Sequence, residues 1–477
     1  MTSQGGLLLV DALMLAVGAC VLAACGLRPR ARIGDAALAF VTGWAALGVG
    51  WTLIAILGSP LTRWQAMTVA AVIAVAAAAV ARARRQVDEP VTAPEVPGVV
   101  GRVATLGGCA ALAALLVAGL ARAAMADADT SWDVWAFWIP KAESFYFHGG
   151  LSAGADGITS FASPEYPPLA TVMDGVAFRF HGVHPADLLL QRWLLVTSFV
   201  VGTGTLLRRQ VPGAFVWPSL AMLVASPLFN LYAASLLADP LIAIALALGA
   251  VTGVRWATGG RSGDAALAAL FLAAAALTKP EGFLLGYLVV FLALALGRRL
   301  RPLAHVLPLV LAPGLALAPW KLWLAAHDAP LWSPLYDFGD LLRPGFLVDR
   351  LDRLHYATSK MLEILFSVDF WLLSIPLALV AVVLAAAAVH RLAVIAAAWL
   401  LVAFLGLASV YWVSPLPVHF YVDTSAQRVL TPVVAVAVVM TPLLLAAACN
   451  AAGVDGVASA TPHPEVGGDD RDVGALV

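Results

Sequence analysis

Charged side chains are scarce in this chain of 477 residues: only 12% are Asp, Glu, Lys or Arg, whereas 61% are hydrophobic. A soluble domain is roughly half apolar and about a quarter charged. The shortage of charge excludes a water-soluble enzyme as the main interpretation. The 28 basic and 29 acidic residues nearly cancel, giving a net charge of −1. Because no excess of positive charge is present, we expect no nucleic-acid partner.

Cysteine is also scarce, with four residues: Cys20, Cys25, Cys109 and Cys449. All four fall in apolar stretches, and no pair has metal-ligand spacing with a histidine nearby. A disulfide framework would place its cysteines in exterior loops. We therefore interpret them as small packing residues. A glycine-rich strand-to-helix motif for a nucleotide is not evident either, which argues against a soluble sugar-nucleotide enzyme.

Long apolar runs are what the sequence has in abundance. About 20 apolar residues are needed to cross a bilayer as a helix, and backbone groups in lipid must bond within the segment. The runs that meet this length predict an all-α polytopic membrane protein with about thirteen transmembrane helices. They lie near 6–27, 33–58, 62–83, 99–125, 185–207, 213–232, 236–257, 264–281, 282–300, 303–326, 371–390, 392–413 and 429–449.

Arginines indicate the orientation of these runs, since basic residues favour cytoplasmic loops. Every odd-numbered run up to the eleventh is followed by arginine. These residues are Arg28, Arg30, Arg32, Arg82, Arg84, Arg85, Arg208, Arg209, Arg255, Arg261, Arg298, Arg299, Arg301 and Arg391. We therefore expect the N-terminus outside, the C-terminus inside, and exterior loops at 126–184, 327–370 and 414–428. The short segment 166–182 carries two charges and is predicted to be an interfacial or half-buried helix rather than a span.

The organisation expected from this pattern has three parts. Residues 1–98 supply the first spans and a Pro- and Glu-rich cytoplasmic linker. Residues 99–449 form the main membrane domain. Residues 450–477 are rich in glycine and acidic residues and are predicted to be a disordered cytoplasmic tail. The expected location is the cell (inner or plasma) membrane.

The first exterior segment holds the most informative polar residues. Trp132, Trp135 and Trp138 recur every three residues, which is typical of an interfacial helix in the headgroup layer. Asp129 and Asp133 are four apart, so on a helix they share a face. Either carboxylate is a candidate site residue at the water–lipid boundary. The alternatives are that Asp129 caps the helix and that Asp133 lies on a solvated face.

Further candidates precede predicted helices. Glu165 and Tyr166 stand before Pro167-Pro168, whose prolines are explained as the start of a helix. Asp239 precedes Pro240, and an N-cap role is sufficient to explain it. Glu165, Tyr166 and Asp239 are the candidate substrate-binding residues of these two segments.

Basic residues in regions expected outside break the orientation rule. Lys141, Lys279 and Arg428 are candidates for binding an anionic group, with Glu281 next to Lys279 and His419 in the last exterior loop. Arginine makes bidentate contacts with phosphate, and a helix N-terminus adds positive potential. The alternatives are that Lys279 snorkels from a helix end and that the orientation rule is only a bias.

The motifs WDVWAFWIPKA, YPPL, ADPL, LTKPEG and TSAQR occur in this order over residues 125–445. Together they resemble the GT-C superfamily, and most closely the bacterial relatives of protein O-mannosyltransferases and aminoarabinose transferases. The resemblance implies a glycosyltransferase that uses a polyprenyl-phosphate-linked sugar at the exterior or periplasmic face. It places the family's first-loop aspartate on Asp133, with Asp129 as second choice, and its phosphate-binding cations among Lys141, Lys279 and Arg428. Some relatives use a divalent cation, for which Asp129 and Asp133 are the candidates, although nothing in the sequence requires one.

Elementary chemistry agrees with that implication. A carboxylate within hydrogen-bond reach supplies the general base that an acceptor hydroxyl needs, and fixed cations stabilise a phosphate leaving group. The acceptor is a glycan, a lipid or a protein. The main alternative is a transporter or flippase for a lipid-linked glycan or small molecule, which would favour mid-membrane charges, broken helices and repeats. A non-catalytic membrane scaffold is the second alternative.

Overall fold

The computed structural model describes residues 3–27, 32–84, 95–96, 98–126, 131–154, 157–297, 302–333, 337–388 and 390–452, and these residues contain helices and no strand. The helices are α1 (Ser3–Ala24), α2 (Ile33–Ile56), α3 (Arg63–Ala83), α4 (Gly98–Ala124), α5 (Ile139–His148), α6 (Leu169–His181), α7 (Pro185–Leu207), α8 (Gly213–Ala225), α9 (Pro227–Ala233), α10 (Asp239–Gly259), α11 (Ser262–Ala276), α12 (Pro280–Leu296), α13 (Leu303–Ala326), α14 (Pro344–Val348), α15 (Leu351–Phe366), α16 (Val368–Trp371), α17 (Ser374–Ala388), α18 (His390–Val413) and α19 (Val418–Ala451). A π-helical turn, Val134–Trp138, leads into α5, and short 3₁₀ turns occupy Ile158–Ser160 and Phe338–Leu342.

The chain is an all-α, multi-pass membrane protein. Within the described ranges, α1, α2, α3, α4, α7, α10, α13, α18 and α19 are long and apolar enough to cross a bilayer. The helices α8 and α9 pass the same test only as a pair, which is bent by 71° at Pro227. The helices α11, α12 and α17 are apolar but only 15 to 17 residues long. Each of the thirteen predicted runs thus contains a helix, while the count of thirteen spans stays a prediction.

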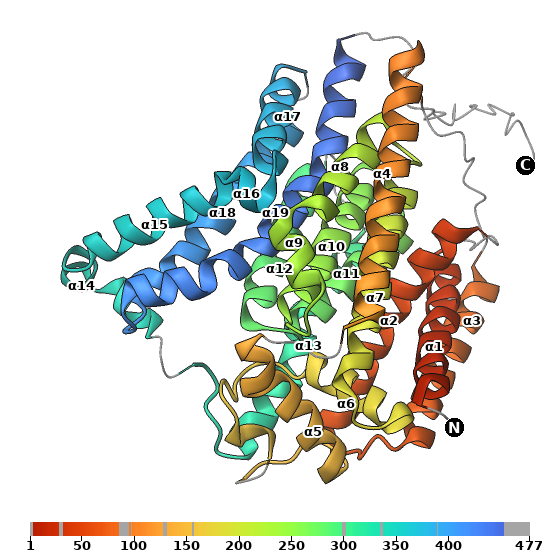
Figure 1. Ribbon diagram of the computed structural model, residues 1–477, viewed down its shortest axis with the longest axis vertical. Coiled ribbons are helices and arrows are strands. Elements are labelled where there is room, and N and C mark those ends of the chain that lie inside the picture. Colours follow the sequence, from red (N-terminus) through yellow and green to blue (C-terminus); the bar gives the residue numbers. More distant parts are fainter. Residues whose placement is uncertain are drawn as a thin grey trace, which may run out of the picture.

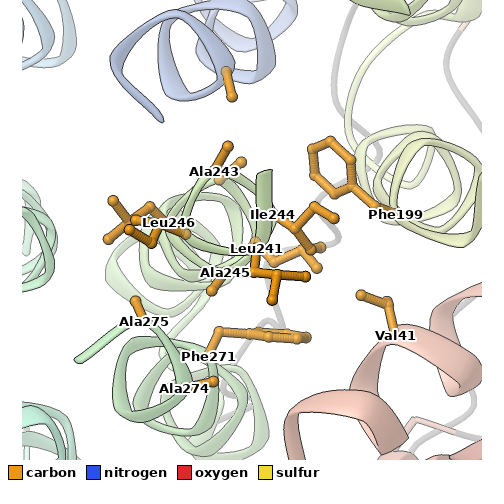
Figure 2. Close-up of a cluster of buried hydrophobic side chains, with 14 of the residues drawn as sticks. Val41, Phe199, Leu241, Ala243, Ile244, Ala245, Leu246, Phe271, Ala274 and Ala275 are labelled. Carbon is orange, nitrogen blue, oxygen red and sulfur yellow. The ribbon is translucent and has the colours of Figure 1, made fainter. Parts of the chain in front are cut away.

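The core of the molecule surrounds α10. Every residue of this helix from Asp239 to Ala257 is buried, as expected for a helix that is apolar on all sides. Figure 2 shows Leu241, Ile244 and Leu246 of α10 among Phe199 of α7 and Phe271 of α11. The helices α11, α12 and α19 pack directly against α10. The first residue of α10 is therefore held at a fixed position within the bundle.

The first two helices pack closely because glycines face each other. A Cβ atom added at Gly18 of α1 would lie 1.7 Å from the carbonyl oxygen of Ala39, and one added at Gly43 of α2 would lie 1.7 Å from that of Met14. Small residues at such crossings let two helix backbones approach each other. In turn, α2 packs against α7, so the first spans are part of the same bundle as the rest of the chain.

The helix α6 is more deeply buried than the half-buried helix predicted for 166–182, while its predicted interfacial position stays a prediction. Its 13 residues are too few to span a bilayer, as predicted, but all of them except Arg179 are buried. The helices α1, α2 and α5 cover it. Its charge is accommodated by an ion pair, since Arg192 Nη2 lies 2.8 Å from Asp174 Oδ2. In the π-helical turn and just before it, Trp132 and Trp135 are exposed as predicted for an aromatic belt, whereas Trp138 is buried.

The two ends of the bundle are distinguished by the segments that lie there. Figure 1 shows the start of α1 at the same end as α5 and α6, and the last turns of α19 at the opposite end. The helices α14 and α15 extend sideways, and α15 packs on α18 and α19. Most of the predicted linker and all of the predicted tail beyond residue 452 lie outside the described residues.

Candidate functional site

Asp133 and Arg428 form an ion pair between distant parts of the chain. Asp133 stands immediately before the π-helical turn that leads into α5. Arg428 lies in the third turn of α19, which corrects the predicted loop 414–428 and the expected helix N-terminus at Arg428, because α19 already begins at Val418. Arg428 Nη1 donates a hydrogen bond to Asp133 Oδ2. Both side chains are 20% exposed, so the pair is partly accessible from outside the bundle.

Asp239 and Lys279 form a second, more buried pair. Asp239 begins α10, and Lys279 occupies the turn between α11 and α12. Lys279 Nζ donates to Asp239 Oδ1 at 3.0 Å and lies 3.8 Å from Glu281 Oε1 in the first turn of α12. The side chain of Asp239 is only 4% exposed. Prolines at positions 240 and 280 start these helices and so fix where the two charges lie.

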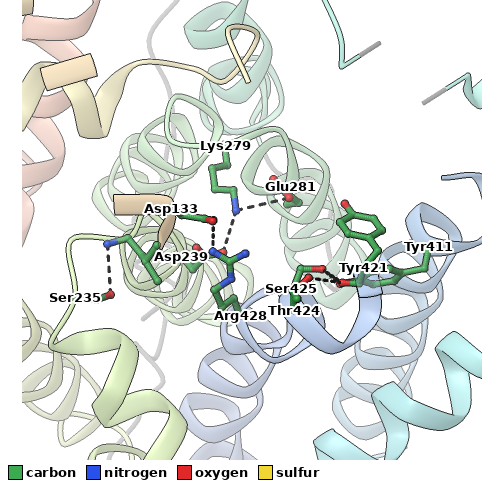
Figure 3. Close-up of polar contacts among 11 residues, drawn as sticks. Asp133, Ser235, Asp239, Lys279, Glu281, Tyr411, Tyr421, Thr424, Ser425 and Arg428 are labelled. Atoms are coloured by element: carbon green, nitrogen blue, oxygen red, sulfur yellow. Dashed lines mark hydrogen bonds and ion pairs between the residues drawn. The ribbon is translucent and has the colours of Figure 1, made fainter. Parts of the chain in front are cut away.

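The two ion pairs make one group, which we name the Arg428 cluster: Asp133, Asp239, Lys279, Glu281 and Arg428. Figure 3 shows their side chains converging, with the interactions drawn as dashed lines. The charge of Arg428 also acts on Asp239 and Lys279. Four elements that are far apart in the sequence thus bring carboxylates and cations together.

The segment that carries Glu165 and Tyr166 is fixed beside this cluster. Trp320 Nε1 of α13 donates to the carbonyl oxygen of Glu165 at 3.1 Å. Three residues after Tyr166, the backbone N–H of Leu169 donates to the carbonyl oxygen of Leu277, at the end of α11, at 2.9 Å. The Tyr166 ring centroid consequently lies 5.6 Å from Lys279 Nζ, within cation–π distance.

A second group of charged residues surrounds the segment that carries Glu165 and Tyr166. We name it the Glu165 cluster: Lys141, Glu165 and Lys321. Lys141 Nζ of α5 donates to the carbonyl oxygen of Ser163 at 2.7 Å and lies 5.9 Å from the Tyr166 ring centroid. Lys321 of α13 donates to the carbonyl oxygen of Leu331, and its charge acts on Glu165. The Tyr166 ring therefore contacts lysines of both clusters.

Burial shifts the protonation of the Glu165 cluster. Lys141 and Glu165 are each only 2% exposed. Burial lowers the pKa of Lys141 to about 7, although the negative charge of Glu165 opposes this shift. Burial likewise raises the pKa of Glu165, while its own backbone N–H, both lysines and a hydrogen bond from Ser333 act in the opposite direction. Both groups are thus shifted toward their neutral forms.

Most of the candidates from the sequence converge; one described candidate, His419, lies apart, and Asp129 cannot be placed. His419 is exposed, and its ring packs against Tyr356 of α15 with ring centroids 4.0 Å apart. Asp129 lies outside the described residues. Closer to the Arg428 cluster, Ser425 of α19 hydrogen-bonds the Tyr411 hydroxyl at 3.0 Å, as Figure 3 shows.

The described structure adds two residues to the site region. Lys321 joins Glu165, and Trp320 anchors its backbone. A lysine within the apolar run 303–326 was itself a signal, because ionisable residues in spans are commonly functional. Among the described residues, no set of three or more His, Cys, Asp and Glu side chains is arranged to hold a metal ion. The Arg428 cluster instead interleaves its carboxylates with cations.

Comparison of the chain with family models, curated proteins and solved structures finds no match. The similarity to the GT-C superfamily consequently rests on the short motifs quoted above, and what it implies is treated as a proposal.

Proposed function

We propose that this protein is an integral-membrane glycosyltransferase. It moves a sugar from a polyprenyl-phosphate donor to an acceptor hydroxyl at the exterior or periplasmic face of the cell membrane. The observation that carries the proposal is the meeting of the Asp133–Arg428 and Asp239–Lys279 pairs in one cluster. A lipid-linked donor needs fixed cations beside the bilayer for its phosphate and a carboxylate nearby for the acceptor.

The charges of the Arg428 cluster suggest how the phosphate binds. Its three carboxylates outnumber its two cations, so a phosphate binds only by replacing a carboxylate as the partner of a cation. Asp133 is the more accessible partner, with 20% of its side chain exposed against 4% for Asp239. In this mechanism the donor phosphate replaces Asp133 as the ion-pair partner of Arg428. Lys279 stays paired with Asp239 and supplies a second positive charge.

The exchange prepares the carboxylate for catalysis. Asp133, released from Arg428, accepts the proton of the acceptor hydroxyl as that oxygen attacks the anomeric carbon. The bond from the anomeric carbon to the phosphate oxygen breaks, and the polyprenyl phosphate leaves with the electron pair. Arg428 and Lys279 stabilise the negative charge that develops on the leaving group.

Binding of the leaving group tests the proposal without knowledge of the sugar. The probe is undecaprenyl phosphate, titrated onto the full chain in lipid nanodiscs. Lys279→Ala and Arg428→Ala are each expected to weaken binding roughly tenfold or more. Arg343→Ala is the matched control, because Arg343 is a highly exposed arginine that pairs with Asp340 away from the cluster. Absence of binding by the wild-type chain, or equal affinity in all variants, would overturn the proposal.

Transfer itself is measured with a panel of labelled undecaprenyl-phosphate sugars and glycan, lipid and protein acceptors. A covalent product that contains the labelled sugar is expected with the wild-type chain. The proposed activity requires this product to disappear in Arg428→Ala and to persist in Arg343→Ala.

A transporter or flippase remains the second candidate, because the bent pair α8–α9 is the kind of broken helix that transporters use. Against it, the buried pair Arg255–Asp264 lies within about one turn of the ends of α10 and α11 rather than at the middle of a span. Movement of a labelled lipid-linked sugar across proteoliposomes without formation of a new glycoside would favour the transporter.

A further inference from the structure

The carboxylate of Glu165 has an oxygen that the protein leaves unsatisfied. Glu165 is 2% exposed, and its Oε2 atom accepts no hydrogen bond from the described residues. Ser333 and the backbone N–H of Glu165 itself bond the same carboxylate, and Oε2 is left without a partner among the described residues. A buried acceptor without a partner is unfavourable, and a hydrogen-bond donor on a bound water or a ligand would satisfy it.

Lys141 offers hydrogen-bond donors beside this oxygen. Its ammonium group has three N–H bonds, and the described residues supply one hydrogen-bond acceptor, the carbonyl oxygen of Ser163. The other recorded neighbours of Nζ are the rings of Phe137 and Tyr166, at 5.2 and 5.9 Å from their centroids. In the described part of the chain, no carboxylate lies within ion-pair distance of Lys141.

An open carboxylate oxygen beside lysine N–H donors determines which chemical class of ligand fits. An anion would be repelled by Glu165, and a cation would be repelled by Lys141 and Lys321. A hydroxyl group fits both, because it donates to a carboxylate oxygen and accepts from an ammonium group. Trp332, which is 54% exposed and whose ring lies 4.0 Å from Lys321 Nζ, adds an aromatic face beside the cluster. Several hydroxyls on a compact ring are the property of a sugar.

The cluster also lies next to the proposed phosphate site. The Tyr166 ring is in contact with Lys279 of the Arg428 cluster and with Lys141 of the Glu165 cluster. We propose that Glu165, Lys141 and Lys321 form a subsite that binds the hydroxyl groups of a sugar. This inference rests on the proposed function, and the sugar is either that of the lipid-linked donor or that of a glycan acceptor.

Two lipid probes distinguish these sources in the full chain in nanodiscs: undecaprenyl phosphate and the same lipid carrying a hexose, with mannose and glucose tested separately. If the subsite holds the donor sugar, the wild-type chain binds one hexose-bearing lipid at least tenfold tighter than the bare lipid. Glu165→Gln and Lys141→Met remove most of that preference, measured in each variant as the ratio of its affinities for the hexose-bearing and the bare lipid. Glu363→Gln, on the exposed face of α15, retains the preference.

If the subsite holds the acceptor, the preference for the hexose-bearing lipid is unchanged in these variants. The Michaelis constant for methyl mannoside or methyl glucoside as soluble acceptor then rises about tenfold in Glu165→Gln. Lys321→Met provides a less buried third variant should a change at Glu165 or Lys141 prevent folding, which thermal unfolding would reveal.

The inference is wrong if the folded variants equal the wild-type chain both in their preference for the hexose-bearing lipid and in their Michaelis constant for the acceptor. It is also wrong if the wild-type chain neither prefers a hexose-bearing lipid nor uses a methyl hexoside as acceptor. Failure of the proposed function has a different signature, because the wild-type chain would then not bind the bare undecaprenyl phosphate.

Discussion

Arg428 is hydrogen-bonded to Asp133 although 295 positions separate them in the sequence. The first lies within a long helix, and the second lies in the connection between α4 and α5. Their ion pair forms the more exposed side of the Arg428 cluster, and the pair of Asp239 and Lys279 forms the buried side. In the proposed mechanism the exposed pair opens to admit a phosphate and the buried pair stays in place.

Replacing Asp133 with Asn tests the proposed base. The amide keeps the shape of the side chain but accepts a proton poorly, so sugar transfer should fall by about 10²- to 10⁴-fold. Binding of undecaprenyl phosphate should be retained or strengthened, since Arg428 loses its competing carboxylate. Initial rates of transfer and titrations with the lipid measure the two effects in the same preparation.

The matched control for this substitution is Asp340→Asn. Asp340 also pairs with an arginine, Arg343, at 2.8 Å, but it lies in the second predicted exterior loop. Its replacement should leave transfer unchanged. Full activity of Asp133→Asn would remove Asp133 from the catalytic role.

The buried amine of Lys141 predicts a pH dependence of stability. Its pKa is about 7 in the folded protein and 10.5 when unfolded, so between these values the unfolded chain binds more protons. The free energy of unfolding should therefore rise with pH over this range, by at most about 1.4 kcal/mol per pH unit from this group. Below about pH 7 the amine is charged in both states, and the cost of burying it is fully present.

Lys141→Met should remove this contribution to the slope. Unfolding in mixed micelles at several pH values between 7 and 10 measures the effect, with Lys360→Met on α15 as control. An identical slope in the wild-type chain and in Lys141→Met would show that Lys141 does not titrate in this range.

The buried pair of Arg192 and Asp174 predicts an asymmetric response to mutation. Arg192 Nη2 lies 2.9 and 2.8 Å from the two oxygens of Asp174, and both residues are largely excluded from solvent. Arg192→Leu alone should destabilise the protein by about 3–5 kcal/mol, because it leaves a buried charge unpaired. The double variant Arg192→Leu/Asp174→Leu should recover much of that loss in thermal unfolding. A double variant as unstable as the single one would contradict the ion-pair explanation.

The predicted orientation is tested by labelling introduced cysteines. Ala153 lies in a loop and Gly259 is the last residue of α10; both are exposed, and the arginine pattern assigns them to opposite faces. After replacement of the four native cysteines by alanine, a membrane-impermeant maleimide should label Ala153→Cys in intact cells. It should label Gly259→Cys only after the membrane is opened. The reverse pattern would place the Arg428 cluster on the cytoplasmic side and end the proposal of an exterior transferase.

Sequence patterns predicted the helices well because the bilayer imposes a simple rule. Long apolar runs must satisfy their backbone groups internally, and each predicted run contains a helix. The count of thirteen spans stays a prediction, because Pro227 bends one run and the helices α11, α12 and α17 are only 15 to 17 residues long. For α6, composition indicated a helix too short to span, but not that other helices would enclose it.

Residue type and order alone determined that this is a helical membrane protein and that Asp239 and Lys279 stand at helix starts. Local rules suffice for that, since a proline or an aspartate before an apolar run acts on its own neighbours. Only the tertiary structure decided which charges meet: Arg428 with Asp133, Lys279 with Asp239, and Lys321 with Glu165. Those contacts depend on how helices hundreds of residues apart pack around α10, and packing of that kind leaves no local signature in the sequence.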